Sequence, residues 1–542
     1  MSRYEAIFLT ALVVALWSLM PITQMWDWDE PLYARTGIEM FLSGNLLLPR
    51  FNDEIFAHKP PLGYWLMGLS AQVFGPSEFA ARFFSAPLMG FAAFMVGRTA
   101  RAMFDQKVGD IAMTIIGTAL MSVYLGAAAM MDAPLMAGYA LSVWAFIKIV
   151  LAKKLRLDWL VCFSFGLLVT LLVKGPVGPA LIGGMVLGVF AFLPKQDRPG
   201  WTGFWALTVA GFVALAGFLA WFLPANAASE GALIREGLGV HVIGRALAPM
   251  EGHGGQGLAG YLMFLPLYIP VIFLGMLPWA AALPQSIGHV FTALERRERI
   301  LLLAWFLPTF LAFSIAATKL PHYIFPALAP LSVAIAVWLN HANLRPHFAA
   351  RLATLLGYML FAIVFGTTAF GFAQAVAPWK ILAAGLLFAA MGLAALRGTL
   401  SAKLVPLWAV ASLAMMQGVY WLGLTEVDRL TKLSRSIGQQ IAAQVPQDAL
   451  VIYASYGEPS LIFYANRPLG KGLVRLKPDA LGAFVQANPK GYAVLTAQNI
   501  DSLRTAVPTI TLRTLHEATA YNVNQNGRLQ TVVLLEWQTP AP

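Results

Sequence analysis

Long apolar stretches separated by short polar connections run along most of this sequence. A membrane-spanning helix needs about 20 mainly apolar residues, and windows of that length give about thirteen candidates. They are residues 5–25, 83–103, 110–128, 133–151, 159–173, 175–193, 202–223, 258–283, 301–317, 321–340, 352–372, 379–397 and 404–423. The pattern predicts a mainly α-helical, polytopic membrane protein. The first run continues to about Ile22 without a small-residue cleavage site, so it is predicted to be a retained helix.

Positive charge alternates between the connections of these predicted helices. One set of connections carries clusters of Lys and Arg at 98–107, 153–156, 195–198, 296–299, 345–351 and 397–403. The short connections of the other set hold almost only Lys174, Lys319 and Lys380. The positive-inside rule makes the first set cytoplasmic. The N-terminus is therefore predicted to be cytoplasmic and, after an odd number of spans, the C-terminus periplasmic.

Composition supports a membrane environment and narrows the partners. Hydrophobic residues make up 58% of the 542 residues and charged residues 12%, against about 45–50% and about 25% in soluble proteins, and the mean hydropathy is +0.68. The net charge is +11, and the basic residues fall in short clusters between apolar runs, which fits orientation and anionic headgroups rather than nucleic acid. A single cysteine, Cys162, excludes an intrachain disulfide and a cysteine-based zinc site.

Three regions outside the predicted helices fall on the same outer face, at about 26–82, 224–257 and after 425. The last has a different pattern. Leucine and isoleucine recur at helical spacing over 430–441, β-type apolar runs follow at 449–453, 492–495 and 531–537, and helix-like segments lie between them. We predict a transmembrane domain over 1–425 and a small periplasmic α/β domain over 426–542. The second domain lacks a phosphate-binding glycine motif, so its expected role is structural or substrate-guiding.

The first outer segment contains paired carboxylates at the start of a predicted interfacial helix. Asp29 and Glu30 precede Pro31, which suits a first helical turn, and Gly44 suits the helix end. Helix capping and interaction with the helix dipole explain both carboxylates without any catalytic role. Further along lies His58-Lys59-Pro60-Pro61-Leu62.

Three ionisable residues lie at predicted helix ends on the same face, namely Asp132, Lys174 and Lys319. An N-cap role explains the aspartate, and snorkelling explains the lysines. A charge at membrane depth nevertheless costs about 2.5–3.5 kcal/mol on insertion scales, so each is a candidate site residue. The loop at 224–257 adds Glu230, Arg235, His241, Arg245, Glu251 and His253, with a glycine-rich stretch at 252–257 that suits a closing loop.

Taken in order, these motifs resemble a known family. Asp29-Glu30, His58-Lys59-Pro60-Pro61-Leu62, Glu78-Phe79-Ala80-Ala81-Arg82, Met131-Asp132-Ala133-Pro134-Leu135, Lys174-Gly175-Pro176-Val177-Gly178 and Lys319-Leu320-Pro321-His322-Tyr323 are similar to blocks of the lipid A aminoarabinose transferases (ArnT-like). Those enzymes are part of the protein O-mannosyltransferase-like GT-C glycosyltransferases. The resemblance covers about residues 25–340, and thirteen helices with an outer C-terminal domain agree with it.

The resemblance implies transfer of a sugar from a polyprenyl-phosphate carrier to a periplasmic acceptor, in a bacterial inner membrane. It places Asp29 and Asp132, with Glu30, near the reaction centre. It makes Lys59 and Lys174 ligands of the carrier phosphate, helped by Arg245 and by the block that holds Lys319 and Tyr323. The implied acceptor is lipid A, and the implied sugar is 4-amino-4-deoxy-L-arabinose.

The chain departs from the family pattern at two positions. The family usually has Arg three residues after the Asp of its Asp-Glu pair, where this chain has Leu32, and Glu before Lys-Pro-Pro, where it has His58. The family binds a divalent ion in this region, and His241 matches its later histidine. Two imidazoles favour zinc over magnesium, with a further oxygen from Asp29, Glu30 or the donor phosphate. The alternative is a pocket without an ion, in which Lys59 and a protonated His58 neutralise the phosphate.

Direct displacement at the anomeric carbon is the mechanism expected from these residues. Lys59, Lys174 and Arg245, with a metal, neutralise the departing lipid phosphate, and Asp29 orients the acceptor or takes its proton. Two alternatives remain open. The chain could transfer another sugar, such as mannose or a uronic acid, to protein or another glycan. It could also transport a lipid-linked sugar, although charges midway along helices would then be expected.

Overall fold

The computed structural model describes residues 1–250, 254–255, 257–341, 401–522 and 528–540, with scattered positions between 348 and 393. Within these residues, eight helical segments are long and apolar enough to cross a membrane, and a bent pair, Gln106–Thr118 with Leu120–Gly126, makes a ninth. The eight are Glu78–Met103, Asp132–Ala152, Leu157–Lys174, Gly200–Ala228, Gly257–Gly275, Arg296–Ile315, Pro321–Asn340 and Ala402–Thr431. The chain is therefore a mainly helical, multi-pass membrane protein.

Each of these nine segments overlaps a predicted span. Two further predicted spans correspond to shorter apolar helices, α1 (Arg3–Leu19, 17 residues) and α10 (Val177–Phe192, 16 residues). The predicted spans 352–372 and 379–397 lie almost entirely outside the described residues. The count of thirteen therefore stays a prediction.

Small residues bring the central helices of the bundle together. Helix α8 (Asp132–Ala152) packs on α5 (Ser85–Met103) and α9 (Leu157–Lys174). A Cβ on Gly138 of α8 would lie 2.8 Å from the carbonyl oxygen of Gly166 on α9, so only glycine permits this approach. Ser142 donates a hydrogen bond to the carbonyl of Phe163 at 3.0 Å across the same contact. Such small-residue seams replace the hydrophobic effect, which does not join helices in lipid.

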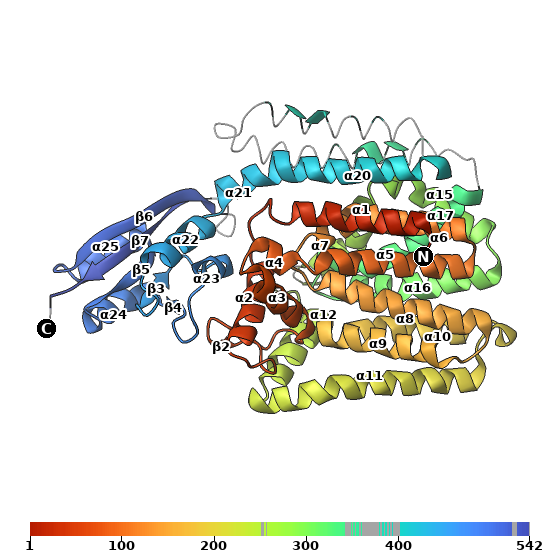
Figure 1. Cartoon of the computed structure of the whole chain (residues 1–542), viewed down its shortest axis with the longest axis horizontal. Coiled ribbons are helices and arrows are strands. Elements are labelled where there is room, and N and C mark those ends of the chain that lie inside the picture. Colours follow the sequence, from red (N-terminus) through yellow and green to blue (C-terminus); the bar gives the residue numbers. More distant parts are fainter. Residues whose placement is uncertain are drawn as a thin grey trace.

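The first outer segment forms a compact layer at one end of the bundle (Figure 1). It comprises α2 (Asp29–Leu42), a hairpin of β1 (Arg50–Phe51) and β2 (Glu54–Ile55), α3 (Leu62–Phe74) and α4 (Glu78–Arg82). Helices α2 and α3 cross at Gly37 and Gly68, where a Cβ on either would lie 2.4 Å from a backbone oxygen of the other helix. Asp29 and Glu30 are thereby fixed over the end of the bundle.

The second outer region is more regular than the predicted loop. Helix α11 (Gly200–Ala228) is followed by a π-helical segment, η2 (Leu233–Gly244), and the short α12 (Arg245–Leu247). A Cβ on Gly237 of η2 would lie 2.8 Å from the carbonyl oxygen of Ala57, so this segment lies against the residues that precede Lys59. Of the glycine-rich stretch, residues 251–253 and 256 lie outside the described residues, and with them Glu251 and His253.

The C-terminal residues fold into an α/β domain beyond the first outer layer, and the N-terminus lies at the opposite end of the molecule (Figure 1). Its five-stranded sheet has the order β4-β3-β5-β7-β6, with β3 parallel to β4 and β5 and antiparallel pairs elsewhere. The strands are β3 (Val451–Ala454), β4 (Val474–Arg475), β5 (Lys490–Thr496), β6 (Thr511–Asn522) and β7 (Arg528–Gln538). Helix α22 (Ser434–Gln444) covers one face of the sheet, and α24 (Leu481–Ala487) and α25 (Ala497–Ala506) cover the other.

Candidate active site

A cavity of about 330 Å³ lies between α8, the start of α10, η2, α16 (Arg296–Ile315) and the 3₁₀ segment η5 (Pro321–Ala327). Apolar residues of α10 and α16 form much of its wall. Its ionisable lining residues are Lys59, Asp132, Lys174, His241, Arg245 and Tyr323. Six of the ten predicted site residues, from distant parts of the chain, therefore line one cavity.

Asp132 and Lys174 form the ion pair of this cavity. The aspartate begins α8 and the lysine ends α9, and Lys174 Nζ lies 2.8 Å from Asp132 Oδ1. Only 3% of the Asp132 side chain and 11% of the Lys174 side chain are exposed. Asp132 Oδ2 is buried without a hydrogen bond from the described residues and lies 4.0 Å from His322 Nε2. The carboxylate is thus held between two basic groups.

Arg245 enters the cavity because its segment is tied to the end of α16. The backbone amides of Ala317 and Thr318 donate to the carbonyls of Ala246 and Arg245, each at 3.0 Å. The guanidinium Nη1 donates to the hydroxyl of Tyr323 at 2.9 Å. The Tyr323 ring in turn lies 5.4 Å from Lys174 Nζ. Tyr323 therefore contacts both cations, as a hydrogen-bond partner of one and an aromatic neighbour of the other.

Lys59 lies in the turn before α3 and lines the same cavity. Burial and the neighbouring charges of Lys174 and Arg245 lower the pKa of Lys59 to about 8, against the opposing effect of Asp29 and Asp132. The amine keeps its proton at neutral pH. Lys59, Lys174 and Arg245 therefore line one cavity together with the buried Asp132 carboxylate, and cationic side chains of this kind suit a phosphate.

Asp29 does not line this cavity, but its charge acts on the pKa values of Lys59 and Tyr33. It begins α2 and is half-buried, and its Oδ1 accepts a hydrogen bond from Tyr33 Oη at 2.9 Å. Its carboxylate makes no capping hydrogen bond to the described backbone of α2. Leu32, one of the two positions that depart from the family pattern expected from the sequence, packs against the apolar cluster of α2 and α3.

Glu30 points the other way and is fully engaged. Its two oxygens accept bonds from Arg82 Nε at 2.9 Å and Nη2 at 2.6 Å, and from the backbone amides of Ala129 at 2.6 Å and Trp26 at 2.8 Å. Burial disfavours its charge, but Arg82 and these amides outweigh burial and lower the pKa of Glu30. This geometry makes Glu30 an anchor between the outer segment and the bundle, and the catalytic role expected from the sequence stays a prediction.

Lys319 is likewise placed away from the predicted phosphate site. Its buried Nζ donates to the carbonyls of Ser314 at 2.6 Å and Ala316 at 2.8 Å. These carbonyls belong to the last turn of α16, where a cation satisfies unpaired backbone acceptors. Lys319 is therefore a helix C-cap and does not line the cavity.

His58 and His241 meet, but they do not make a complete metal site. Their rings lie 4.0 Å apart at 39°. Burial, with the nearby His58, Lys59 and Arg245, lowers the pKa of His241 to about 3, so this ring is neutral. Zinc takes at least three protein ligands, and no group of three His, Cys, Asp or Glu with suitable spacing occurs in the described part of the chain. The described residues do not fit the predicted zinc site.

Two residues beside the predicted site were not predicted from the sequence, namely Tyr33 and His322. His322 belongs to a quoted motif, but its approach to Asp132 depends on how η5 packs on α8. Tyr33, four residues after Asp29, holds the carboxylate by the hydrogen bond across one helical turn, and that spacing was a readable signal.

Comparison with known proteins agrees with the motif resemblance. Residues 58–223 match the family described as dolichyl-phosphate-mannose-protein mannosyltransferase. An undecaprenyl phosphate-α-4-amino-4-deoxy-L-arabinose arabinosyl transferase of Proteus mirabilis is 30% identical over 345 residues, covering 62% of this chain and 59% of that protein. Its counterpart in Pectobacterium atrosepticum is 29% identical over 367 residues, covering 66% and 63%. The match thus spans about three fifths of the relatives' length.

The fold is shared over nearly the whole chain with a solved structure. The structure of ArnT from Cupriavidus metallidurans bound to undecaprenyl phosphate superposes with a TM-score of 0.76 at 20% identity, covering 98% of this chain and 97% of that one. The apo structure of the same protein gives a TM-score of 0.72. The chain therefore has the fold of that ArnT structure.

Proposed function

We propose that this chain is a membrane glycosyltransferase that moves a sugar from a polyprenyl-phosphate carrier to lipid A, with 4-amino-4-deoxy-L-arabinose as the sugar. The observation that carries the proposal is the cluster of Lys59, Lys174 and Arg245 around buried Asp132 in a cavity with apolar walls. A polyprenyl phosphate is a single anionic group on a long apolar chain, and this cavity matches both parts. The curated relatives are named for such a donor.

The proposed topology has thirteen spans, made of the nine long segments, α1, α10 and the two predicted spans at 352–372 and 379–397. With cytoplasmic Lys and Arg clusters, the N-terminus is cytoplasmic and the domain at 426–542 periplasmic. The transmembrane catalytic domain is then 1–425. A phosphatase fused after Pro542 should be active. Cytoplasmic activity of a fluorescent protein fused there would mean that the number of spans is even.

In the proposed mechanism, the three cations neutralise the phosphate as it leaves the anomeric carbon. Lys174 is positioned by Asp132, and Arg245 by Tyr323. Fixed charges in a cavity of low dielectric stabilise the developing phosphate without reorganising at the moment of reaction. Lys319, which caps α16, takes no part.

Asp29 acts on the acceptor side in this mechanism. If the acceptor atom belongs to a phosphate, that group is already ionised, and Asp29 orients it through the surrounding cations. If the acceptor is a hydroxyl, Asp29 takes its proton. Direct displacement inverts the anomeric carbon, so a product with retained configuration would contradict it. The anomeric configuration can be read from the proton NMR coupling of the isolated product.

The mechanism takes no step through a metal ion. His58 and His241 lack a third described ligand, and the three cations already supply the charge that a divalent ion would bring. We propose that the chain works without one. Full activity after stringent chelation, with no zinc detected in the protein, is expected. Loss of activity on chelation that zinc restores would contradict this, and His58→Ala and His241→Ala would then lose zinc as well.

The decisive experiment incubates purified protein with lipid A and a panel of polyprenyl-phosphate sugars. Release of polyprenyl phosphate together with a glycosylated acceptor is expected, most rapidly with aminoarabinose. The Lys174→Ala variant should be inactive, whereas Lys154→Ala, a lysine exposed outside the cavity, should behave as wild type. Transfer of mannose or a uronic acid instead would keep the reaction and change the sugar. Movement of intact donor between leaflets, without release, would favour a transporter.

A further inference from the structure

The sugar of the donor needs hydrogen-bond acceptors, which the cations around the phosphate do not supply. Lysine and arginine side chains only donate, whereas each hydroxyl or ammonium group of a sugar brings at least one donor of its own. Buried donors that remain unpaired cost free energy. The sugar subsite should therefore contain acceptor groups that are not already taken by Lys59, Lys174 or Arg245.

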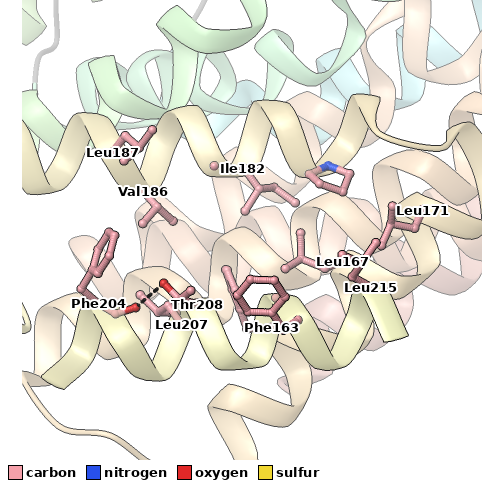
Figure 2. A pocket seen from close by; sticks show the side chains of 14 residues that line it. Phe163, Leu167, Leu171, Ile182, Val186, Leu187, Phe204, Leu207, Thr208 and Leu215 are labelled. Atoms are coloured by element: carbon pink, nitrogen blue, oxygen red, sulfur yellow. Dashed lines mark hydrogen bonds between the residues drawn. The ribbon is translucent and has the colours of Figure 1, made fainter. Parts of the chain in front are cut away.

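The cavity of about 370 Å³ between α9, α10 and α11 does not provide such acceptors. Figure 2 shows that its lining presents carbon from all three helices, with Phe163, Ile182 and Leu215 around the space. The one hydroxyl in the lining, that of Thr208, donates to the carbonyl of Phe204 at 2.9 Å. The sugar must therefore be bound elsewhere.

Asp132 and His322 together offer an acceptor of this kind. Asp132 Oδ1 accepts from Lys174 Nζ, whereas its buried Oδ2 receives no hydrogen bond from the described residues. His322 Nε2 lies 4.0 Å from this Oδ2. A hydrogen bond needs about 2.7–3.2 Å, and active-site bonds that are long before substrate binds commonly tighten in the complex. With its proton on Nε2 toward Asp132, a neutral His322 has Nδ1 left as an acceptor.

The turn that carries His322 is fixed by its backbone. The carbonyl of Leu320 accepts from Tyr268 Oη of α14 (Tyr268–Gly275) and from the amide of Tyr323, each at 3.1 Å. The rings of His322 and Tyr323 meet edge to face, with centroids 5.0 Å apart. Tyr323 lines the cavity with apolar walls, and His322 does not. Because 18% of the His322 side chain is exposed, its ring opens onto space outside that cavity.

His322 is near both sides of the proposed reaction. The charges of Lys59 and Lys174, on the phosphate side, act on it. The charge of Asp29, on the acceptor side, acts on it as well. In a direct displacement the acceptor atom, the anomeric carbon and the leaving phosphate lie in line, so the sugar occupies the space between the two sides. A ring on which the charges of both sides act lies beside this sugar.

We propose that His322 determines sugar specificity, because its Nδ1 accepts a hydrogen bond from one hydroxyl or ammonium group of the donor sugar. The proposal rests on the proposed function. Asp132 orients the ring through Nε2, and the three cations hold the phosphate whatever the sugar is. A site that bonds a polar substrate group strongly rejects an analogue without that group, since its own polar atom is then left unpaired. His322 thus selects a sugar with a hydrogen-bond donor at one ring position.

Two amide side chains separate the roles of the two imidazole nitrogens. Asparagine ends at the δ position, where its oxygen can replace Nδ1, and glutamine ends at the ε position, where its NH₂ group can replace Nε2. His322→Asn therefore keeps the acceptor for the sugar, whereas His322→Gln keeps the donor for Asp132 and loses that acceptor. His516→Gln is the matched control, because His516 lies on β6 and its Nε2 contacts Ser436 Oγ of the same outer domain at 2.7 Å.

The test measures kcat/KM in nanodiscs for the aminoarabinose donor and for three analogues, which lack the 2-hydroxyl, the 3-hydroxyl or the 4-amino group. Wild type, His516→Gln and His322→Asn should reject one analogue by at least about 100-fold. His322→Gln should lose this discrimination and keep the KM for lipid A. Discrimination that is absent from the wild type, or that survives in His322→Gln, overturns the proposal. In the second case, a raised KM for lipid A assigns His322 to the acceptor, and uniformly lower rates assign it a structural role.

A binding measurement does not depend on transfer. Wild-type protein should bind a polyprenyl phosphate that carries the sugar at least about five-fold more tightly than polyprenyl phosphate itself, the contribution of one hydrogen bond. His322→Gln should abolish this difference and leave the Kd of polyprenyl phosphate unchanged. Equal affinities in the wild type, or a difference that survives in His322→Gln, contradict the proposal. If the difference behaves as expected but no sugar is transferred, the proposed function fails while the sugar site stands. If another sugar is transferred, its own deoxy analogues decide the role of His322, and only the proposed sugar fails.

Discussion

Adjacent carboxylates at the start of α2 should respond in opposite ways to loss of charge. Asp29→Asn removes the charge that lies next to the cationic cluster but keeps an oxygen that can accept from Tyr33. Glu30→Gln removes the charge that faces buried Arg82. We expect the first variant to fold normally and lose turnover, and the second to lose stability.

The structure sets the size of both effects. Glu30 accepts four hydrogen bonds, and a glutamine amide would turn its NH₂ toward two of those donors while leaving Arg82 buried without a countercharge. Breaking one side of a buried ion pair costs about 3–5 kcal/mol. A positioned carboxylate that takes a proton contributes about 10²–10⁴-fold to the rate, so Asp29→Asn should lower kcat by that factor with an acceptor hydroxyl. With an acceptor phosphate the loss reflects orientation alone and is smaller.

The assay compares thermal unfolding in detergent with single-turnover release of polyprenyl phosphate for the same preparations. Glu30→Gln should unfold several degrees below the wild-type melting temperature. Asp29→Asn should unfold at the wild-type melting temperature. Because the pKa of Glu30 is lowered, its stabilising contribution is present above the ordinary glutamate pKa and is lost as the pH falls through the lowered value. Wild-type turnover in Asp29→Asn, with a lowered melting temperature, would make Asp29 only a helix-capping residue and refute this reasoning.

Three further predictions concern the cations and the outer domain. The pKa of Lys59 is lowered to about 8, so its charge is present below that pH and is lost above it. The KM for donor should therefore rise as the pH passes 8. Lys59→Arg, whose charge does not titrate in this range, should make the KM independent of pH there. Asp132→Asn leaves Lys174 beside two other cations without its countercharge, so both kcat and melting temperature should fall; a change in kcat alone would contradict a structural role for the pair. Ser460→Ala removes a 2.6 Å bond to Asp27 and should lower the stability of the outer layer by about 1 kcal/mol, measured as faster hydrogen exchange in α2.

Hydrophobic pattern was sufficient for the spans that the structure describes and for part of the outer domain, because both depend on local periodicity. The predicted strands at 492–495 and 531–537 lie within β5 and β7. Strand β6, from Thr511 to Asn522, was not predicted. Much of it is exposed, and it pairs only with β7 at one edge of the sheet, so it lacks the apolar run that marks the buried strands. The loop predicted at 224–257 contains helical segments at Leu233–Gly244 and Arg245–Leu247 that were not predicted.

Motif order identified six residues that line one cavity, but it did not predict the direction of each side chain. Lys174 and Lys319 look alike in sequence, since each stands at a helix end before a proline-containing turn. Lys174 meets Asp132, 42 residues earlier, whereas Lys319 turns back onto the last carbonyls of its own helix. Likewise the partner of Glu30 is Arg82, 52 residues away. The partner that each of these side chains binds depends on helix packing, which no local pattern in a single sequence specifies.

The C-terminal domain is better understood as part of the site's support than as an appendage. Hydrogen bonds attach the segment just before Asp29 to this domain. The backbone amide of Gln24 donates to Asp428 Oδ2 at 2.6 Å, and that of Met25 donates to Tyr464 Oη at 2.9 Å. The carboxylate of Asp27 accepts hydrogen bonds from Ser460. Further along α2, the guanidinium of Arg35 donates to the carbonyl of Arg467 at 2.6 Å. Because these bonds fix both ends of the turn that presents Asp29, a displacement of the domain must move that carboxylate relative to Lys59. The domain therefore fixes the position of Asp29, the carboxylate predicted to act in the reaction.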